Sequence, residues 1–457
     1  MFKRVFIANR GEIALRVIRS CRALGIESVL AVSTADQDSL PARLADRTVV
    51  IGPPEASASY LNVGSILSAA VGTKCDALHP GYGFMSEDAI LAEACAEHGI
   101  TFIGPNAQVL RQLGDKLSAR QTAIDAGAQL TPGAQVRTSE DAERFAVENG
   151  YPLMIKAVSG GGGRGIRIVH DASELRKTIA LAQNEALAAF NDDRVYIEPY
   201  ITHARHIEVQ ILRDEHGNTA ALGERDCSVQ RRHQKILEES PAPNLPDQLR
   251  HALFEDAVKI VDHVGYVGAG TVEFLVDVEQ EKHYFLEVNA RIQVEHPVTE
   301  VVTNTDLIAE QIRIANRRPV SEHLRSDEGV AVRGWAIEAR INCEDPENDF
   351  LPRPGLITNM TLPGGPGVRV DTYCQTGSVV PPFYDSLLAK IIAYGRDRSE
   401  ALARLKTALH ELRIEGISHN VAFIQELLEQ PDFEDGRAHT QWLSDYLVGE
   451  RKGLVAP

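Results

Sequence analysis

Several protein classes are excluded by what this sequence lacks. Only six of its 457 residues are cysteine, and no two of them form a CxxC pair. Cysteines spread this thinly predict neither a disulfide framework nor a zinc site, and they favour a reducing compartment. The N-terminal segment lacks the long apolar run of a signal peptide, and the uncharged stretch 56–73 is too rich in Ser, Asn and Gly to span a membrane. We therefore expect a cytoplasmic protein with no membrane partner.

Basic residues are scarce relative to acidic ones. The chain carries 47 Lys and Arg against 64 Asp and Glu, which gives a formal net charge of −17. Nucleic acids and anionic membranes are bound through a basic surface, so this balance argues against both as partners. It leaves room for a small anionic substrate held by a few local cations. The hydrophobic content of 44% and the charged content of 24% are typical of a globular chain, and the length suggests about three domains.

The first part of the sequence alternates short apolar runs with amphipathic stretches. The apolar runs occur at 5–8, 28–32, 49–51, 77–78 and 102–103. This βαβ rhythm predicts a parallel sheet in roughly residues 1–110. The turn after the first run reads NRGE, so the GxGxxG fingerprint of a dinucleotide-binding fold is missing where it would be expected.

The rest of the sequence changes pattern several times. A strand, a glycine loop and a second strand are followed by paired strands, with helices expected at 173–190, 247–264, 305–317 and 399–412. A polar segment without periodicity, 319–328, marks a boundary. We therefore expect an α/β protein (α+β overall) with domains at 1–113, 114–320 and 330–445, and with a mobile lid at about 130–203.

A glycine cluster, GGGGRG at 160–165, lies shortly after Lys156. The alternating run 166–169 follows it, which predicts a hairpin turn and not a strand-to-helix dinucleotide turn. Glycines let backbone N–H groups approach phosphate oxygens closely, and Lys156 would add positive charge. The cluster therefore fits a flap over phosphates; a mobile glycine hairpin without a ligand is the alternative.

The strongest chemical signal is the segment 284–296, YFLEVNARIQVEH. Side chains of an extended segment alternate between two faces, so one face would carry Glu287, Asn289, Arg291, Gln293 and Glu295. Asn is depleted in strands, and carboxylates in register suit Mg²⁺, which prefers hard oxygen ligands shared with phosphates. The segment thus predicts a magnesium–phosphate site. An ordinary half-exposed strand with a polar face is the alternative.

A second candidate strand, 271–277, precedes this segment and contains Glu273. The short spacer 279–283 allows a hairpin that places Glu273 beside Glu287. Two carboxylates that meet across a hairpin repel each other unless a cation lies between them. The pair supports a metal site, although the two residues could also be unrelated in space.

Four further features are less decisive. The basic cluster ERDCSVQRRHQK at 224–235 would be a solvated loop if it stood alone, and it gains weight beside acidic strands. His206 begins an alternating strand, where a histidine is more often structural. The turn HPGYGF at 79–84 lies at a strand end, where ligands bind in α/β sheets, but packing of its aromatic rings explains it equally well. Sequence pattern cannot show whether Arg340 reaches the site.

Taken together, IANRGEIA, HPGYGF, GGGGRG, ERDCSVQRRHQK and EVNARIQVEHPVTE resemble biotin carboxylase, the ATP-grasp component of acetyl-CoA carboxylase and related biotin-dependent carboxylases. The resemblance covers essentially the whole chain, and the last two motifs are highly specific. It implies an N-terminal biotin carboxylase domain, an ATP-grasp domain with a glycine-flap lid and a biotin carboxylase C-terminal domain. The implied reaction carboxylates biotin with ATP and bicarbonate through carboxyphosphate and CO₂, as the first half-reaction of an acyl-CoA carboxylase.

The resemblance also implies the site residues and cofactors, which are ATP, Mg²⁺ (or Mn²⁺) and biotin. The ATP-binding set is Lys116, Lys156, Gly162, Gly163, Glu198, Pro199, Tyr200, Ile201, His206, Gln230, His233, Glu273 and Glu287. The metal ligands are Glu273, Glu287 and Asn289. Bicarbonate is held by Lys235, Arg291, Gln293 and the backbone of Val294. Glu295 is the general base for bicarbonate and Arg340 stabilises the biotin enolate, so the catalytic set is Arg291, Glu295, Lys235 and Arg340.

Two positions depart from the family pattern. Pro199 stands where the family usually carries Lys, and Ser159 replaces a small residue, often Gly or Ala, at the base of the flap. Proline keeps its carbonyl, so backbone recognition of adenine survives while a side-chain cation is lost. Neither departure touches the metal or bicarbonate residues, and we expect activity.

Partners and alternatives follow from the same resemblance. The Ala-Met-Lys-Met signature of a biotin carrier is not found in the sequence. We therefore expect biotin on a separate biotin carboxyl carrier protein, with carboxyltransferase subunits as further partners and a homodimeric assembly. The alternatives are another carboxyphosphate-forming ATP-grasp ligase and a non-catalytic regulatory subunit of the same fold.

Overall fold

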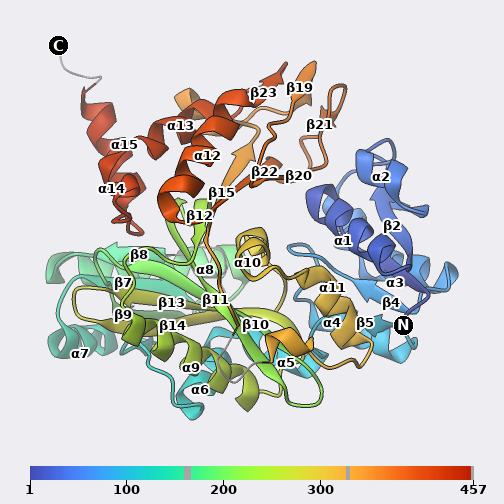
Figure 1. Cartoon of the computed structure of the whole chain (residues 1–457). Coiled ribbons are helices and arrows are strands. Elements are labelled where there is room, and N and C mark those ends of the chain that lie inside the picture. The colour runs from blue at the N-terminus through green and yellow to red at the C-terminus, as the bar shows by residue number, and fades with distance from the viewer. Residues whose placement is uncertain (159–165, 326–329, 454–457) are drawn as a thin grey trace.

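The computed structural model describes residues 1–158, 166–325 and 330–453. Figure 1 shows an N-terminal lobe in blue, a middle region in green and yellow, and a C-terminal lobe in orange and red. Helices pack against sheets throughout, so the predicted α/β class is confirmed. Within the described residues, no helix is both long and apolar enough to cross a membrane.

The N-terminal lobe contains the predicted parallel sheet. Its strands lie in the order β3-β2-β1-β4-β5, and all neighbouring pairs are parallel. Central residues are buried on both faces: Val5 and Ile7 join one apolar cluster, while Phe6 joins another. The elements are β1 (Arg4–Ile7), α1 (Gly11–Ala23), β2 (Glu27–Ser33), α2 (Leu40–Leu44), β3 (Arg47–Gly52), α3 (Val63–Gly72), β4 (Ala77–His79), α4 (Ala89–Glu97), β5 (Thr101–Phe102) and α5 (Ala107–Gly114).

A small four-stranded sheet lies in the region predicted to form the lid. Its order is β6-β9-β7-β8, and the antiparallel pairing of β7 with β8 confirms the hairpin predicted around the glycine cluster. The cluster itself, with Gly162 and Gly163, lies outside the described residues, as does Ser159. The elements are β6 (Ala134–Val136), α7 (Ser139–Asn149), β7 (Leu153–Ala157), β8 (Ile166–Val169), α8 (Ala172–Phe190) and β9 (Val195–Pro199).

An eight-stranded sheet joins the middle of the chain to its C-terminal part. Its order is β14-β13-β10-β11-β12-β15-β22-β20, so it continues across the polar segment 319–328. The junction is the antiparallel pair of β12 and β15, in which Leu237 lies opposite Ala339. The strands are β10 (Arg205–Arg213), β11 (Thr219–Arg231), β12 (Gln234–Ser240), β13 (Gly268–Asp277), β14 (Lys282–Asn289), β15 (Trp335–Asn342), β20 (Val368–Thr372) and β22 (Leu387–Gly395).

Helices cover this sheet on both faces, and short strands complete the C-terminal lobe. The helices of the middle region are α6 (Lys116–Asp125), α9 (Asp247–His263), α10 (His296–Thr303) and α11 (Leu307–Ala315). The C-terminal elements are β16 (Glu344–Asp345), β17 (Leu351–Pro352), β18 (Gly355–Leu356), β19 (Asn359–Thr361), β21 (Val379–Val380), α12 (Arg398–Glu411), β23 (Arg413–Glu415), α13 (Val421–Leu428), α14 (Pro431–Glu434) and α15 (Trp442–Gly453).

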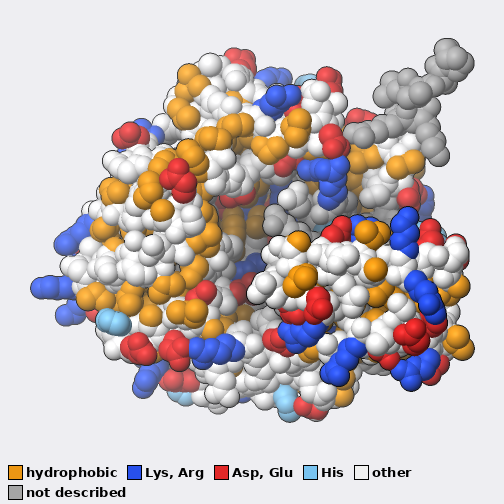
Figure 2. Space-filling view, turned by 180° about the vertical axis from the view of Figure 1, so that it is seen from behind, with side chains coloured by type: hydrophobic (Ala, Val, Ile, Leu, Met, Phe, Trp, Pro, Cys, Tyr) orange, Lys and Arg blue, Asp and Glu red, His pale blue; other side chains and the backbone are white. Residues whose placement is uncertain are grey.

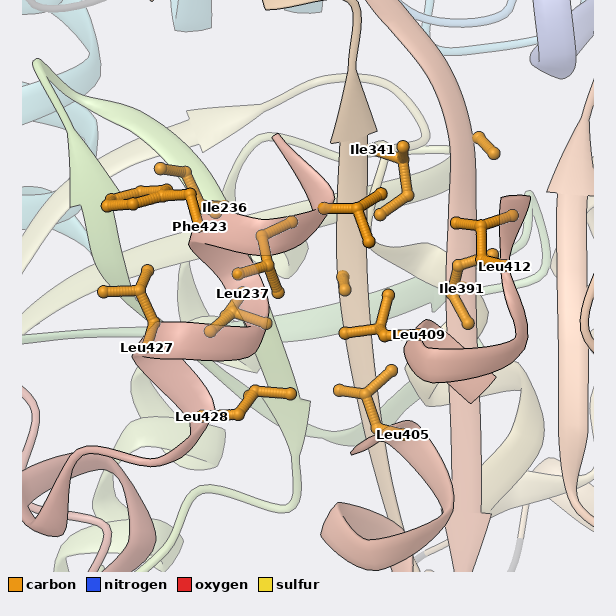
Figure 3. Packing of buried hydrophobic residues seen from close by; sticks show 14 of the residues in the cluster. Ile236, Leu237, Ile341, Ile391, Leu405, Leu409, Leu412, Phe423, Leu427 and Leu428 are labelled. Atoms are coloured by element: carbon orange, nitrogen blue, oxygen red, sulfur yellow. The ribbon is translucent and has the colours of Figure 1, made fainter. Parts of the chain in front are cut away.

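Strand β15 shows how this packing directs polar side chains. Its apolar residues Ile337, Ala339 and Ile341 join the cluster formed with α12 and α13, in which Figure 3 labels Ile341, Leu405 and Leu409 along the strand. Because side chains alternate along a strand, Glu338 and Arg340 point to the opposite face, which α10 covers. The fold therefore brings Arg340 from the C-terminal part to the polar centre of the sheet.

Candidate active site

The predicted hairpin of carboxylates is present in the large sheet. Glu273 on β13 lies directly opposite Glu287 on β14, and on its other side it lies opposite Glu208 on β10. Three glutamates thus stand side by side on neighbouring strands. Like charges in this arrangement destabilise a sheet, so cations must compensate them.

The segment after this hairpin does not stay extended, and the prediction that one strand face carries all five polar residues is wrong. Strand β14 ends at Asn289, and α10 begins at His296 with Pro297 in its first turn. Proline presets the backbone angle of a first helical turn, and Glu295 already has φ −81° and ψ 8°. Arg291, Gln293 and Glu295 therefore lie on a connecting segment, residues 290–295.

The Lys235 ammonium compensates the carboxylates at the centre of the site. Its Nζ donates to Glu208 at 2.7 Å, to Glu273 at 3.0 Å and to Glu295 at 2.6 Å. Burial alone would raise the pKa of Glu273, but Lys235 and then His206 hold it well below its ordinary value. The grouping of His206, Glu208 and Glu273 could also hold a cation, and Lys235 already contributes positive charge there.

Glu295 accepts from a second cation as well. Arg340 donates from Nη2 to Glu295 at 2.8 Å and from Nε to Glu238 at 2.5 Å. Burial opposes ionisation of Glu295, yet the charges of Lys235 and Arg340 lower its pKa far below the ordinary value. Burial raises the pKa of Glu238 to about 7 in spite of Arg340. Glu295 is therefore a charged, buried carboxylate between two cations.

Glu287 stands apart from this cluster. Its side chain is exposed to solvent, and no ion pair of Glu287 is found among the described residues. Desolvation by the surrounding protein and the neighbouring Glu273 charge raise its pKa, while Lys116 lowers it. A carboxylate that has no ion-pair partner and lies beside a second carboxylate is chemically suited to a divalent cation. Asn289 is buried next to it, and its Oδ1 accepts from Arg291 at 2.8 Å, which leaves the second lone pair of that oxygen for a cation.

The segment 290–295 is held mainly by side chains from elsewhere. Arg291 donates to Glu87 at 3.1 Å, and Glu87 also accepts from the Ala290 N–H at 2.8 Å. Gln293 donates to Glu273 at 2.8 Å. The predicted bicarbonate residues are thus brought to the edge of the Lys235 cluster, although not by a shared strand.

Arg225 is an important residue that the sequence reasoning did not single out. It is fully buried and donates to Glu208 at 2.5 Å and to Gln293 at 2.9 Å. It also donates to Gln210, Thr271 and Thr299. The signal available in the sequence was its place within the basic motif 224–235. The structure adds that Arg225 on β11 lies opposite Glu208 on β10. Glu87 and Glu238 gave no comparable signal.

The predicted nucleotide residues line the region between the large sheet and the lid. Lys116 donates to the Ala157 carbonyl at 3.4 Å, and burial lowers its pKa. Lys156 forms an ion pair with the buried Glu198. Figure 2 shows a hollow in the middle of the rear face of the molecule, between the lobes.

The other nucleotide residues lie on two neighbouring stretches. The Tyr200 N–H, directly after Pro199, donates to the Pro152 carbonyl at 2.9 Å, which ties the 198–201 stretch to the start of β7 within the lid. His206 Nδ1 lies 2.9 Å from Gln230 Nε2, and His206 Nε2 lies 2.9 Å from Glu273. His233 is close enough to Lys156 and His206 that burial and these charges lower its pKa.

The turn HPGYGF joins the first βα turn of the chain. Asn9 of NRGE donates from Nδ2 to the carbonyls of Pro80 and Tyr82, both at 2.7 Å. Gly81 has φ +64°, and a Cβ there would come within 2.7 Å of the Asn9 amide, so glycine is required. Phe84 stacks on Tyr60 at 5.1 Å. The motif therefore has a packing role, as the alternative interpretation held.

Family models match three consecutive parts of the chain. The model for "Biotin carboxylase, N-terminal domain" matches residues 1–110, and the model for "Biotin carboxylase C-terminal domain" matches residues 338–445. Between them, the model for "Carbamoyl-phosphate synthase L chain, ATP binding domain" matches residues 115–323.

Full-length relatives and solved structures agree with these matches. Biotin carboxylase 1 of Bacillus subtilis (strain 168) is 50% identical over 450 residues, which is 98% of this chain and 99% of the relative. A biotin carboxylase–β-γ-ATP complex from Campylobacter jejuni has a TM-score of 0.93 at 42% identity and covers 97% of this chain and 99% of its own. A biotin carboxylase domain dimer of 2-oxoglutarate carboxylase from Hydrogenobacter thermophilus, solved with MgADP, ADP and bicarbonate, has a TM-score of 0.92 at 41% identity and covers 98% of both chains.

Proposed function

The chain belongs to the biotin carboxylase family, and from this membership we propose how its residues divide the reaction between them. The protein is an ATP-dependent ligase that carboxylates biotin with bicarbonate. The observation that carries this assignment of roles is the Glu295 carboxylate held between Lys235 and Arg340. A buried base lies there between two cations, and these cations can stabilise the negative charge of bicarbonate and of the biotin enolate.

We assign Mg·ATP to the region between the large sheet and the lid. Lys116 and Lys156 supply positive charge for phosphates; Gly162 and Gly163, which belong to the same proposed ATP set, lie outside the described residues. Adenine is recognised by Glu198, Pro199, Tyr200 and Ile201, with His206, Gln230 and His233 completing the set. When bound, Mg²⁺ would neutralise phosphate charge during transfer, and Glu273, Glu287 and Asn289 would hold it.

Bicarbonate is assigned to Lys235, Arg291, Gln293 and the Val294 backbone. Glu295 removes the bicarbonate proton, the freed oxygen attacks the terminal phosphate of ATP, and ADP leaves as carboxyphosphate forms. In the structure Lys235 bonds to Glu295 itself, which keeps this base ionised. Binding of bicarbonate would draw part of the Lys235 charge away from Glu295, and the basicity of Glu295 would then rise.

Biotin is assigned to Arg340. Carboxyphosphate breaks down to CO₂ and phosphate, the phosphate removes the biotin N1′ proton, and Arg340 stabilises the enolate oxygen that results. The same guanidinium contacts Glu295 at 2.8 Å, so the biotin side and the bicarbonate side of the site share one cation. Glu238 holds the other edge of the guanidinium and fixes its orientation. This arrangement brings the CO₂ acceptor next to the place where CO₂ is released.

The assembly and location are proposals of the same kind. We propose that biotin is delivered by a biotin carboxyl carrier protein, that carboxyltransferase subunits complete the system, and that two copies of this chain form a homodimer in the cytoplasm. The dimer among the related structures supports the homodimer, and the six free, buried cysteines support a reducing compartment.

The function is tested by measuring ADP release with bicarbonate in the presence and absence of free biotin. We expect biotin to raise the rate, since biotin is the acceptor of the carboxyl group. A rate of ADP release that does not change with biotin but rises with ammonia would instead favour another carboxyphosphate-forming ligase. Absence of Mg·ATP binding at millimolar concentration, measured by calorimetry, would point to a non-catalytic subunit.

The metal assignment predicts that Glu287→Gln weakens Mg·ATP binding by about 10-fold or more, because loss even of a group that only supports a metal ligand costs about that much. Glu287 is exposed, so the substitution leaves the fold intact. Glu279→Gln is the matched control, because it removes the charge of another exposed glutamate, which lies in the turn between β13 and β14. Equal Mg·ATP affinities for the two variants in calorimetry would remove Glu287 from the metal site.

A further inference from the structure

Lys390 is a completely buried lysine that the assignments above leave without a role. It lies on β22 directly opposite Arg340, so both side chains point to the face of the sheet that α10 covers. Lysine is almost never fully buried unless it is paired. Its pairing should therefore show what it does.

The Lys390 ammonium joins three parts of the chain that are distant in sequence. Its Nζ donates to the Val294 carbonyl at 2.7 Å and lies 3.0 Å from Glu12 Oε1. Glu12 belongs to α1 of the N-terminal lobe, and it also accepts from the Tyr82 hydroxyl of the HPGYGF turn. The ammonium thus ties the N-terminal lobe and β22 to the segment 290–295.

The contact with Val294 matters because the segment 290–295 belongs to neither a strand nor a helix. Side chains from elsewhere hold its backbone near both ends: Glu87 accepts from the Ala290 N–H, and Lys390 donates to the Val294 carbonyl. A buried ion pair is weak evidence for stability, since apolar residues of similar volume often serve as well. A buried ammonium aimed at one carbonyl is better explained by the need to fix that carbonyl in place.

We propose that Lys390 is a positioning residue that fixes the segment 290–295 through Val294, so that Arg291, Gln293 and the Val294 backbone present a preformed bicarbonate site. This inference rests on the proposed bicarbonate role of that segment. Lys390 contacts none of the nucleotide residues that the structure describes, so its loss affects bicarbonate use and not ATP binding.

The test compares Lys390→Met with the double variant Glu12→Gln/Lys390→Met. The single variant leaves the Glu12 carboxylate without its cation, whereas the double variant removes both charges and restores the balance. We expect both variants to raise the KM for bicarbonate by about 10- to 100-fold, since a displacement of about 1 Å can cost this much. The Kd for Mg·ATP should stay within about twofold of wild type, and the double variant should regain thermal stability.

Three outcomes would overturn the proposal. One is a double variant with wild-type stability and a wild-type KM for bicarbonate. Another is a parallel rise of the bicarbonate KM and the Mg·ATP Kd, which would indicate general damage. The third is a double variant that fails to fold while Glu12→Gln alone folds, because Lys390 would then serve stability alone.

Gln293→Ala separates failure of this inference from failure of the proposed function. If Gln293→Ala raises the bicarbonate KM but the Lys390 variants do not, only the role of Lys390 is wrong. If Gln293→Ala also leaves the bicarbonate KM unchanged, the assignment of bicarbonate to this segment is wrong, and the role of Lys390 falls with it.

Discussion

Replacing Glu295 by Gln is expected to lower biotin-dependent turnover by about 10²- to 10⁴-fold, the usual cost of removing a general base. Glu295 is buried between Lys235 and Arg340, and both cations keep it ionised, so the substitution removes a charge that is present at neutral pH. Mg·ATP binding should remain, because Glu287 and the lysines Lys116 and Lys156 are untouched. Steady-state ADP release and calorimetry with Mg·ATP measure the two effects separately.

Glu238→Gln is the matched control for this prediction. Glu238 is a buried carboxylate on the same Arg340 guanidinium, but it does not contact Lys235 in the structure. Its pKa of about 7 means that it is partly protonated at neutral pH, and Gln mimics that neutral form. The Gln amide oxygen can still accept from Arg340 Nε, so only the charge assistance of that bond is lost, and we expect turnover within about 10-fold of wild type. If Glu295→Gln instead weakened Mg·ATP binding strongly while turnover persisted at high Mg²⁺, Glu295 would be a metal ligand and not the base.

The parts of the site that depend on the alternation of side chains along one strand could be predicted from the sequence. Alternation in the run 271–277 and in 284–289 was enough to place Glu273 beside Glu287, because a short hairpin leaves little freedom of register. The same reasoning failed beyond Asn289. There the helix that starts at His296 overrides the alternating pattern, and the alternation of Arg291, Gln293 and Glu295 has no structural meaning.

The parts that depend on long-range packing could not be predicted. Arg340 reaches Glu295 because β15 continues the large sheet next to β12, and no local pattern reveals that pairing. Glu87 and Lys390 reach the segment 290–295 from about 200 and 100 residues away in the chain. Burial of a charge is a property of the assembled fold, so these residues look like surface charges in the sequence.

The three glutamates on the neighbouring strands β10, β13 and β14 form a row, and this row explains why Lys235 and Arg225 are needed beside it. Glu208 lies opposite Glu273, which lies opposite Glu287, and the first two are buried. Lys235 bonds to Glu208 and Glu273, while Arg225 bonds to the other oxygen of Glu208. Only the exposed end of the row, Glu287, has no ion-pair partner among the described residues, although the Lys116 charge offsets part of the rise in its pKa that desolvation and Glu273 cause. The sheet therefore leaves negative charge where the divalent cation is proposed to bind.

Replacing Arg225 by Met is therefore expected to lower the free energy of unfolding by about 3–5 kcal/mol, the usual cost of leaving one partner of a buried ion pair uncompensated. Both side chains of the Arg225–Glu208 pair are 0% exposed, and Arg225 also holds Gln293 in place, so turnover should fall together with stability.

Arg232→Met is the matched control, because Arg232 lies in the same basic motif but its side chain is 69% exposed. Its ion pair with Asp349 is at the surface, where such pairs contribute little to stability. Denaturant unfolding of the three proteins measures the difference. Unfolding midpoints for Arg225→Met and Arg232→Met that both match wild type would show that the glutamate row does not depend on Arg225, and that Lys235 alone compensates it.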